Sequence, residues 1–198
     1  MATKQRKARF GLPLKIFMFL AVTLVPLAAI TWWVSVQELR KSMTSEFTTK
    51  GSAIARSLAS SGVDLLLTRD ASTVQAIVDQ FAAIPGVAYV MVYDPKKTLV
   101  AHTFAPLVPS GIVEMNVVPG ETAQQIRDVE FADPVSGKSR QIIDIGVPVL
   151  AGQLGTVRVG MDKAIIEAAA IRAGKDLLLV FGGVSVAAVL ALDRKSVV

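Results

Sequence analysis

The hydrophobic and polar positions divide the chain into two apolar runs separated by a long mixed segment. Residues 16–36 form a 21-residue run without a charged side chain, and residues 177–192 form a second run of 16 residues. At about 1.5 Å per residue, the first run is as long as the roughly 30 Å hydrocarbon core of a bilayer. We therefore predict a transmembrane helix over residues 16–36 and a second, incomplete one over residues 177–192.

Two amphipathic helices are predicted after the first run. Over residues 37–68 the apolar residues recur on one helix face, and glycine and serine near 60–62 indicate a kink. That face consists of Leu39, Met43, Phe47, Ile54, Leu58 and Leu65. A second helix, capped by Asp70 or Ser72, is expected to end before Pro85. Its apolar face consists of Val74, Ile77, Val78 and Phe81.

After residue 86 the period of the pattern becomes that of β-strands. The pattern predicts a hairpin from residues 87–93 and 98–104, followed by strands at 124–131, 139–150 and 154–161. Alternation places Val87, Tyr89, Met91 and Tyr93 on one face of the first strand, and Thr98, Val100, His102 and Phe104 on one face of the second.

The remaining elements are a loop and a last helix. Residues 105–123 read as a long loop, and such loops are often functional. Asp162 is expected to cap a final helix over 163–175 that continues into the second apolar run. Because strands joined by short turns pair antiparallel, the order of elements predicts an α+β fold. Its five-stranded antiparallel sheet packs on helices.

The charges indicate which side of a membrane each part occupies. The chain has a mean hydropathy of +0.52 and a net charge of +5. The positive excess lies in residues 1–15, whereas residues 37–176 carry 14 basic and 15 acidic side chains, a net of −1. By the positive-inside rule, residues 1–15 are expected in the cytoplasm and residues 37–176 on the exported side of the membrane. The neutral middle segment argues against a nucleic-acid surface.

Three alternatives bear on the ends of the chain. A cleaved signal peptide has a shorter apolar core than residues 16–36, and residues 177–192 could instead be a buried core helix. The last six residues, 193–198, resemble the translation of a common sequencing adapter, so we expect them not to be native.

The absence of cysteine excludes thiol catalysis and cysteine metal sites.

Two stretches carry a resemblance to a known family. The sequences GVAYVMVYDPKKTLVAHTFAP (86–106) and IIDIGVPVLAGQLGTVRVGMD (142–162) resemble the extracytoplasmic sensor domains called single Cache or PDC domains. Together with the flanking helices, the resemblance covers residues 37–176. It implies a PAS-like antiparallel sheet behind a long N-terminal helix. It also implies a small-molecule site under the long loop.

The resemblance further implies a role in signal transduction. In such receptors the terminal helix moves the second membrane span, which leads to a cytoplasmic histidine kinase, chemotaxis or cyclic-nucleotide module. Citrate and dicarboxylate sensors of the family carry His-x-x-Pro, with Arg three residues before the His. Here His102 and Pro106 are one residue further apart, and Leu99 stands at the Arg position, so this departure argues against carboxylate binding through that motif.

Six residues are candidates for contacts to a ligand. His102 is the only histidine, a residue type that can sense protons or bind an anion, although it could instead be a half-buried strand residue with a satisfied ring. Tyr89 and Tyr93 can line a pocket, although core packing explains them equally well. Arginine can clamp an anion through its planar fork, although each arginine could equally be a solvated or paired surface charge. The arginines considered are Arg69, Arg127, Arg140 and Arg158, of which we select the first three.

No chemistry beyond binding is indicated by the motifs. No nucleophile–base set, phosphate loop or metal-spaced cluster is visible, so we expect no catalytic residue, metal or cofactor. We expect a receptor fragment that binds a small molecule, inserts in the lipid bilayer and forms a homodimer through residues 37–68. The alternative is a membrane protein whose exported domain binds a partner protein in an envelope assembly. An exported enzyme has no supporting constellation.

Overall fold

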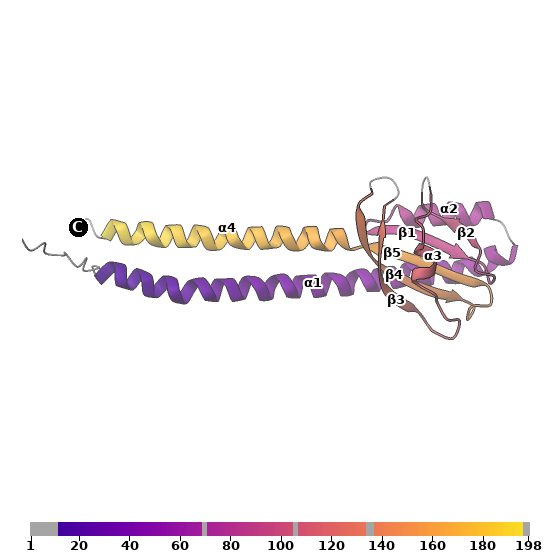
Figure 1. Cartoon of the computed structure of the whole chain (residues 1–198), viewed down its shortest axis with the longest axis horizontal. Helices are drawn as coiled ribbons and strands as arrows, with labels where there is room; N and C mark the ends of the chain where they lie inside the picture. The colour runs from indigo at the N-terminus through magenta and orange to yellow at the C-terminus, as the bar shows by residue number, and fades with distance from the viewer. Residues whose placement is uncertain (1–11, 69–70, 105–106, 134–136, 196–198) are drawn as a thin grey trace, which may run out of the picture. The chain divides into compact units, whose positions relative to one another are not determined.

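Five strands form one antiparallel sheet in a computed structural model that describes residues 12–68, 71–104, 107–133 and 137–195 (Figure 1). The strands are β1 (Val87–Tyr93), β2 (Leu99–His102), β3 (Gln125–Ala132), β4 (Ser139–Val149) and β5 (Gly155–Asp162), in the spatial order β2-β1-β5-β4-β3. The helices are α1 (Leu12–Thr68), α2 (Ala71–Ala82), α3 (Ile112–Met115) and α4 (Lys163–Lys195). The predicted α+β fold with a five-stranded antiparallel sheet and a long N-terminal helix is confirmed.

The chain divides into two compact units. One comprises Arg40–Ala169, with the whole sheet, and the other comprises Met1–Leu39 and Ala170–Val198. In the second unit the Trp32 indole Nε1 donates a hydrogen bond to the carbonyl oxygen of Gly174 at 3.0 Å. A side chain at Gly174 would meet that indole at 3.1 Å, so glycine allows the close approach.

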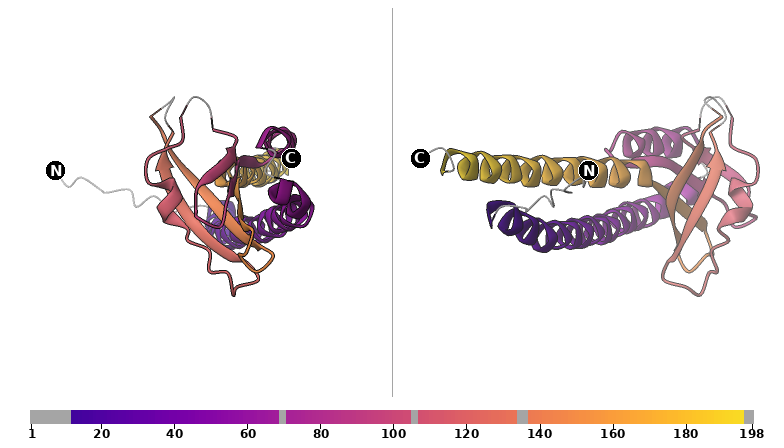
Figure 2. Two further views of the ribbon diagram at one scale, coloured as in Figure 1. Left: turned by 90° about the vertical axis from the view of Figure 1, so that its right-hand side faces the viewer. Right: turned by 60° about the vertical axis from the view of Figure 1, so that its left-hand side comes forward.

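One face of the sheet packs against α1 and α2 (Figure 2). The strands contribute alternating residues, among them Val90, Ile145 and Val159. The helices contribute Met43, Phe47, Ile54, Leu58, Val74, Ile77, Val78 and Phe81, all predicted to face a core. At Gly51 α1 lies so close to the sheet that a side chain there would overlap Ile145 and Met161.

The other face packs against α3 and the loops around it. Tyr89, Met91 and Tyr93 point to this side, as the alternation predicted. Val87 does not, because a β-bulge between Val87 and Tyr89 turns it toward the helix side. The loop predicted over residues 105–123 contains the short helix α3 among its described residues, and Gly111 precedes that helix at φ 79°.

The main helices lie where the sequence predicted helices, and the differences concern where each begins, bends or ends. α1 runs through residues 60–62 without a break in its helical assignment, where a kink was expected. The Asp162 carboxylate caps α4 by accepting a hydrogen bond from the Ala164 N–H at 2.8 Å, as predicted. β5 ends at Asp162 and α4 begins at Lys163, so no loop separates them.

Among the described residues, one helical segment, Val22–Ser61, is long and apolar enough to cross a membrane. It overlaps the predicted span over residues 16–36. The predicted second span lies within α4, and its side chains from residue 185 onward fall outside the described part. Asp70, proposed as a cap for α2, also falls outside it.

Candidate functional site

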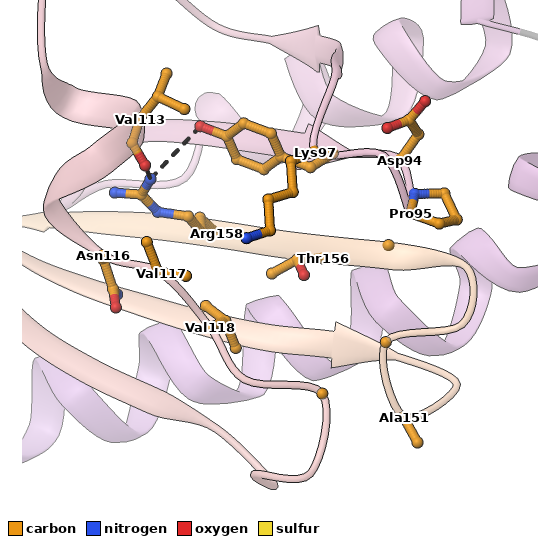
Figure 3. Close-up of a pocket in the computed structure, with 14 residues that line it drawn as sticks. Asp94, Pro95, Lys97, Val113, Asn116, Val117, Val118, Ala151, Thr156 and Arg158 are labelled. Carbon is orange, nitrogen blue, oxygen red and sulfur yellow. Dashed lines mark hydrogen bonds between the residues drawn. The ribbon is translucent and has the colours of Figure 1, made fainter.

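A cavity of about 250 Å³ opens on the sheet face that α3 covers (Figure 3). It lies between the end of β1, the start of β5, the β4–β5 turn and residues 113–120, here called the covering segment. Its lining consists of Tyr93, Asp94, Pro95, Lys97, Val113, Asn116, Val117, Val118, Gly120, Ala151, Gly152, Gly155, Thr156 and Arg158. A cavity of this volume suits a small organic ligand.

Glycines hold the covering segment against the sheet. A side chain at Gly120 would meet the carbonyl oxygen of Ala151 at 2.8 Å, and one at Gly152 would meet the Gly120 Cα at 3.0 Å. At Gly146 on β4 a side chain would overlap that of Val118. The covering segment and the β4–β5 turn therefore touch backbone to backbone, and this contact closes one end of the cavity.

The floor of the cavity holds a buried ion pair. Arg158 on β5 is 2% exposed and Asp144 on β4 is fully buried. Arg158 Nε donates to Asp144 Oδ1 at 3.2 Å and to Oδ2 at 3.1 Å, and Nη2 donates to Oδ2 as well. A buried charge is tolerated only when it is paired and hydrogen-bonded, and both conditions hold here.

Further hydrogen bonds tie this ion pair to the cavity walls. The Tyr89 hydroxyl donates to Asp144 Oδ2 at 2.5 Å, and Asn116 Nδ2 donates to Asp144 Oδ1 at 3.0 Å. Arg158 Nη1 donates to the carbonyl oxygen of Val113 at 3.0 Å and to the Tyr93 hydroxyl at 3.5 Å (Figure 3). The covering segment is thus bonded to the sheet at Val113 and at Asn116.

The electrostatics keep this network in one protonation state. Burial raises the pKa of Tyr89, and the neighbouring Asp144 carboxylate raises it further. Burial also raises the pKa of Tyr93. Burial alone would lower the pKa of Arg158, but hydrogen bonds and attraction to Asp144 outweigh it, and the pKa is raised. Both tyrosines are therefore neutral at physiological pH and Arg158 is a cation.

The hydrogen-bonding capacity of Asp144 is used within this network. Both of its carboxylate oxygens accept hydrogen bonds from more than one donor. Within the described part of the chain, no group of three or more His, Asp or Glu side chains is placed to hold a metal ion. The lining offers hydroxyl, amide, ammonium and apolar groups that can contact a small molecule.

The six candidate ligand residues separate in space. Tyr93 lines the cavity, and Tyr89 lies beneath it in the Asp144 network. His102 on β2, Arg127 on β3 and Arg140 on β4 are not among the lining residues. Arg69 lies outside the described residues.

The three candidates away from the cavity have other surroundings. Arg140 pairs with Asp162 at 2.6 Å and with Asp133 at 3.5 Å. Arg127 is exposed to solvent. His102 lies near Phe104, with ring centres 6.4 Å apart, and its Nδ1 has no hydrogen-bond partner among the described residues.

Sequence reasoning did not select Asp144, Asn116, Lys97 and Thr156. A signal existed for the first, because Asp144 is the one charged residue in the apolar run from Ile142 to Val149. A charge inside such a strand requires a partner, and Arg158 in the next strand was the available cation. Nothing in the sequence marked the other three, because their positions depend on how the covering segment and the β1–β2 turn fold back.

The chain was compared with known proteins. The sequence profile of the family described as single cache domain 3 matches residues 38–172. A comparison with curated protein sequences finds no match. Solved structures with a similar fold include the sensor domain of the Vibrio cholerae histidine kinase DctB, at 16% identity and a TM-score of 0.50. The match covers 75% of this chain and 59% of the DctB chain, so this chain spans less than two thirds of that relative.

Two further structures are periplasmic or ligand-binding domains. The periplasmic domain of Vibrio cholerae LuxQ matches at 15% identity and a TM-score of 0.50, over 72% of this chain and 70% of that one. The ligand-binding domain of the Pseudomonas aeruginosa PAO1 amino acid chemoreceptor PctC, solved with GABA, matches at 20% identity and a TM-score of 0.34, over 65% of this chain and 63% of that one. Since the family profile covers the whole sheet, α2 and the adjoining parts of α1 and α4, the chain belongs to the single cache domain family of non-catalytic sensor domains.

Proposed function

We propose that this chain is the ligand-sensing input of a bacterial transmembrane receptor and that the cavity takes up a small molecule. The observation that carries the proposal is the position of the cavity on β5. Gly155, Thr156 and Arg158 of that strand line it, and the strand continues without a loop into α4. A ligand in the cavity therefore contacts the element that leads out of the domain.

The start of α4 is bonded to the rest of the sheet. Asp162 forms an ion pair with Arg140 at 2.6 Å, and Lys163 forms one with Asp128 at 2.8 Å. A ligand that prefers one position of β5 shifts these contacts and α4 with them. The shift in the equilibrium equals the difference in ligand affinity between the two positions and no more.

The topology of the receptor follows from charge and hydropathy. We propose that residues 16–36 and 177–192 cross the inner membrane, with the basic residues 1–15 in the cytoplasm and residues 37–176 in the periplasm. The parent gene then encodes a cytoplasmic histidine kinase, chemotaxis or cyclic-nucleotide module after α4. Reading that gene beyond the codon for Leu192 tests this part, and a frame that stops without an output module contradicts it.

We also propose that the receptor is a homodimer through residues 37–68. Over residues 40–61 this part of α1 packs one face on the sheet, with Ile54 and Leu58 buried, and leaves the opposite face exposed. Sedimentation of the full chain in detergent is expected to give a dimer. A monomer at concentrations at which the chain is folded would contradict the homodimer and leave ligand binding unaffected.

Ligand binding is tested on the full chain in lipid nanodiscs by amide hydrogen exchange with a library of small metabolites. A ligand in the cavity is expected to slow exchange in residues 93–97, 113–120 and 151–158. The variant Thr156→Phe fills the cavity from β5 and should abolish that protection. The matched control is Thr98→Phe, an exposed position outside the lining. If no compound protects these amides, or Thr156→Phe leaves protection intact, the cavity is not the ligand site.

A partner-binding protein is the second candidate. Two apolar side chains that line the cavity are exposed, Val117 at 53% and Val113 at 40%, and Leu107, which precedes α3 in the chain, is exposed at 69%. Apolar groups that cluster on a surface can mark a protein interface. A stable complex with an envelope protein that is lost in Leu107→Ser, together with no protection by any metabolite, would favour this function over ligand sensing.

A further inference from the structure

The cavity lining holds three strongly ionisable side chains, and their charges are not equally available to a ligand. These are Asp94, Lys97 and Arg158. The charge of Arg158 is neutralised by Asp144, and its N–H groups already donate to Asp144, Val113 and Tyr93. A ligand at the floor of the cavity therefore contacts a neutral ion pair, although an arginine is present.

The carboxylate of Asp94 is turned away from the cavity. Its Oδ1 accepts a hydrogen bond from the backbone N–H of Thr98 at 2.7 Å, which fixes the β1–β2 turn. In Figure 3 this carboxylate points outward past Pro95, on the far side of the turn from Arg158. Asp94 thus has a structural partner and does not compensate a charge inside the cavity.

Lys97 carries the uncompensated charge. Lys97 lines the cavity together with Thr156 and Arg158, and in Figure 3 its side chain extends from the turn toward Thr156. No hydrogen bond or ion pair joins its ammonium group to another residue in the described part of the chain. Its backbone has φ 63°, a left-handed conformation that is strained for every residue with a Cβ and is usually left to glycine. A lysine therefore stands at a turn position where glycine would be unstrained.

We propose that Lys97 determines the charge of the ligand and that the ligand is a small monoanion with an apolar body. This inference rests on the proposed function, in which the cavity is the ligand site. The anionic group is held by the Lys97 ammonium and the Thr156 hydroxyl, and the apolar body lies against Val117 and Val118. A second anionic group on the ligand would lack a free cation, and burying an unpaired charge is costly.

Hydrogen exchange on the full chain in nanodiscs tests this with compounds of matched size. The probes are butyrate, lactate and pyruvate as monoanions, succinate and malate as dianions, butyramide as a neutral compound and butylammonium as a cation. We expect a monoanion to protect residues 93–97, 113–120 and 151–158 at the lowest concentration. Tighter protection by a dianion, the neutral compound or the cation overturns the proposed ligand class and upholds the cavity as the ligand site.

Variants at the turn complete the test. Loss of one charge-assisted hydrogen bond in Lys97→Ala should weaken the monoanion about 10- to 100-fold, whereas Lys97→Arg keeps the charge and should retain binding. The matched control is Lys96→Ala, a neighbouring exposed lysine outside the lining. Equal monoanion affinity in Lys97→Ala and the unaltered chain overturns the role of Lys97. Absence of protection by every probe overturns the proposed ligand class, and the metabolite library then decides separately whether the cavity binds any ligand.

Discussion

The side-chain amide of Gln75 bonds to both backbone groups of His102. Nε2 donates to the His102 carbonyl oxygen at 2.9 Å, and Oε1 accepts from the His102 N–H at 3.2 Å. His102 lies on β2, an edge strand of the sheet. The peptide groups of an edge strand are open to pairing with another chain. The Gln75 amide of α2 occupies the place of a neighbouring peptide and covers this edge.

Removing the two hydrogen bonds between Gln75 and His102 should make β2 less tightly held. Gln75→Ala is expected to speed amide exchange at His102 and to lower the free energy of unfolding by about 1–2 kcal/mol, since two hydrogen bonds of roughly 1 kcal/mol each are lost. The matched control, Gln80→Ala, is exposed on the same helix and should change neither quantity. Unchanged exchange at His102 in Gln75→Ala would show that α2 does not hold the strand.

Breaking the buried ion pair should be costly from either side. Arg158→Met leaves the Asp144 carboxylate buried without its cation, and we expect a loss of about 3–5 kcal/mol in unfolding free energy. The double variant Arg158→Met, Asp144→Leu removes both charges and should recover much of that loss. Thermal and denaturant unfolding of the full chain measure both effects. A double variant no more stable than Arg158→Met would mean that the pair acts mainly through its packing.

The two tyrosines give a pH dependence that is easy to isolate. The chain has two tyrosines, Tyr89 and Tyr93, and the folded pKa of both is raised above the ordinary value of 10.0. Above about pH 10 the folded state binds more protons than the unfolded state, so stability is full below pH 10 and falls as the pH rises.

Tyrosinate absorbance measures this directly. The folded chain should ionise its tyrosines at higher pH than the denatured chain, whose tyrosines should titrate near 10.0. Folded and denatured curves that coincide would mean that neither hydroxyl is buried as described. Stability should fall with pH above 10, because the unfolded chain releases the tyrosine protons before the folded chain does.

Gly146→Ala should lift the covering segment off the sheet. The added methyl group would overlap the side chain of Val118, and overpacking of this kind costs about 1–3 kcal/mol. Amide exchange in residues 113–120 should accelerate while exchange in α2 stays unchanged. The control is Gly137→Ala, since a side chain at Gly137 meets no atom within 4 Å. Because Gly137 has φ 66°, the control carries turn strain of its own, remote from the cavity.

The fold was largely predictable because each element has a local period. Val90 and Val92 face the helices and Tyr89 and Tyr93 face α3, as strict alternation requires. Val87 broke the rule at a β-bulge, which depends on pairing with β5 and has no signature in a single strand. The short α3 was missed because four residues are too few to establish a period.

The site was less predictable because it depends on pairs distant in sequence. The hydroxyl of Tyr89 meets a carboxylate 55 positions away, and Arg158 meets the same carboxylate from 14 positions away. The sequence alone does not distinguish a paired surface arginine from one at the cavity. Strand register places the Arg158 side chain at the cavity floor and that of Arg140 against Asp162. The position of Lys97 at the cavity depends on a turn in which its φ is 63°, a left-handed conformation that residues other than glycine rarely adopt.

The direct junction of β5 and α4 has a consequence for affinity. Asp162 is the last residue of β5, and its carboxylate caps α4. Its backbone N–H also donates to the Gly86 carbonyl oxygen at 2.9 Å, so the junction is held on both sides without a connecting loop. Coupling free energies are reciprocal: if the ligand biases α4, then whatever restrains α4 biases the ligand by the same factor. If α4 crosses the membrane as proposed, bilayer thickness or a load on the far end of the helix would change the ligand affinity of the cavity, and a dissociation constant for this domain would be defined only together with what anchors α4.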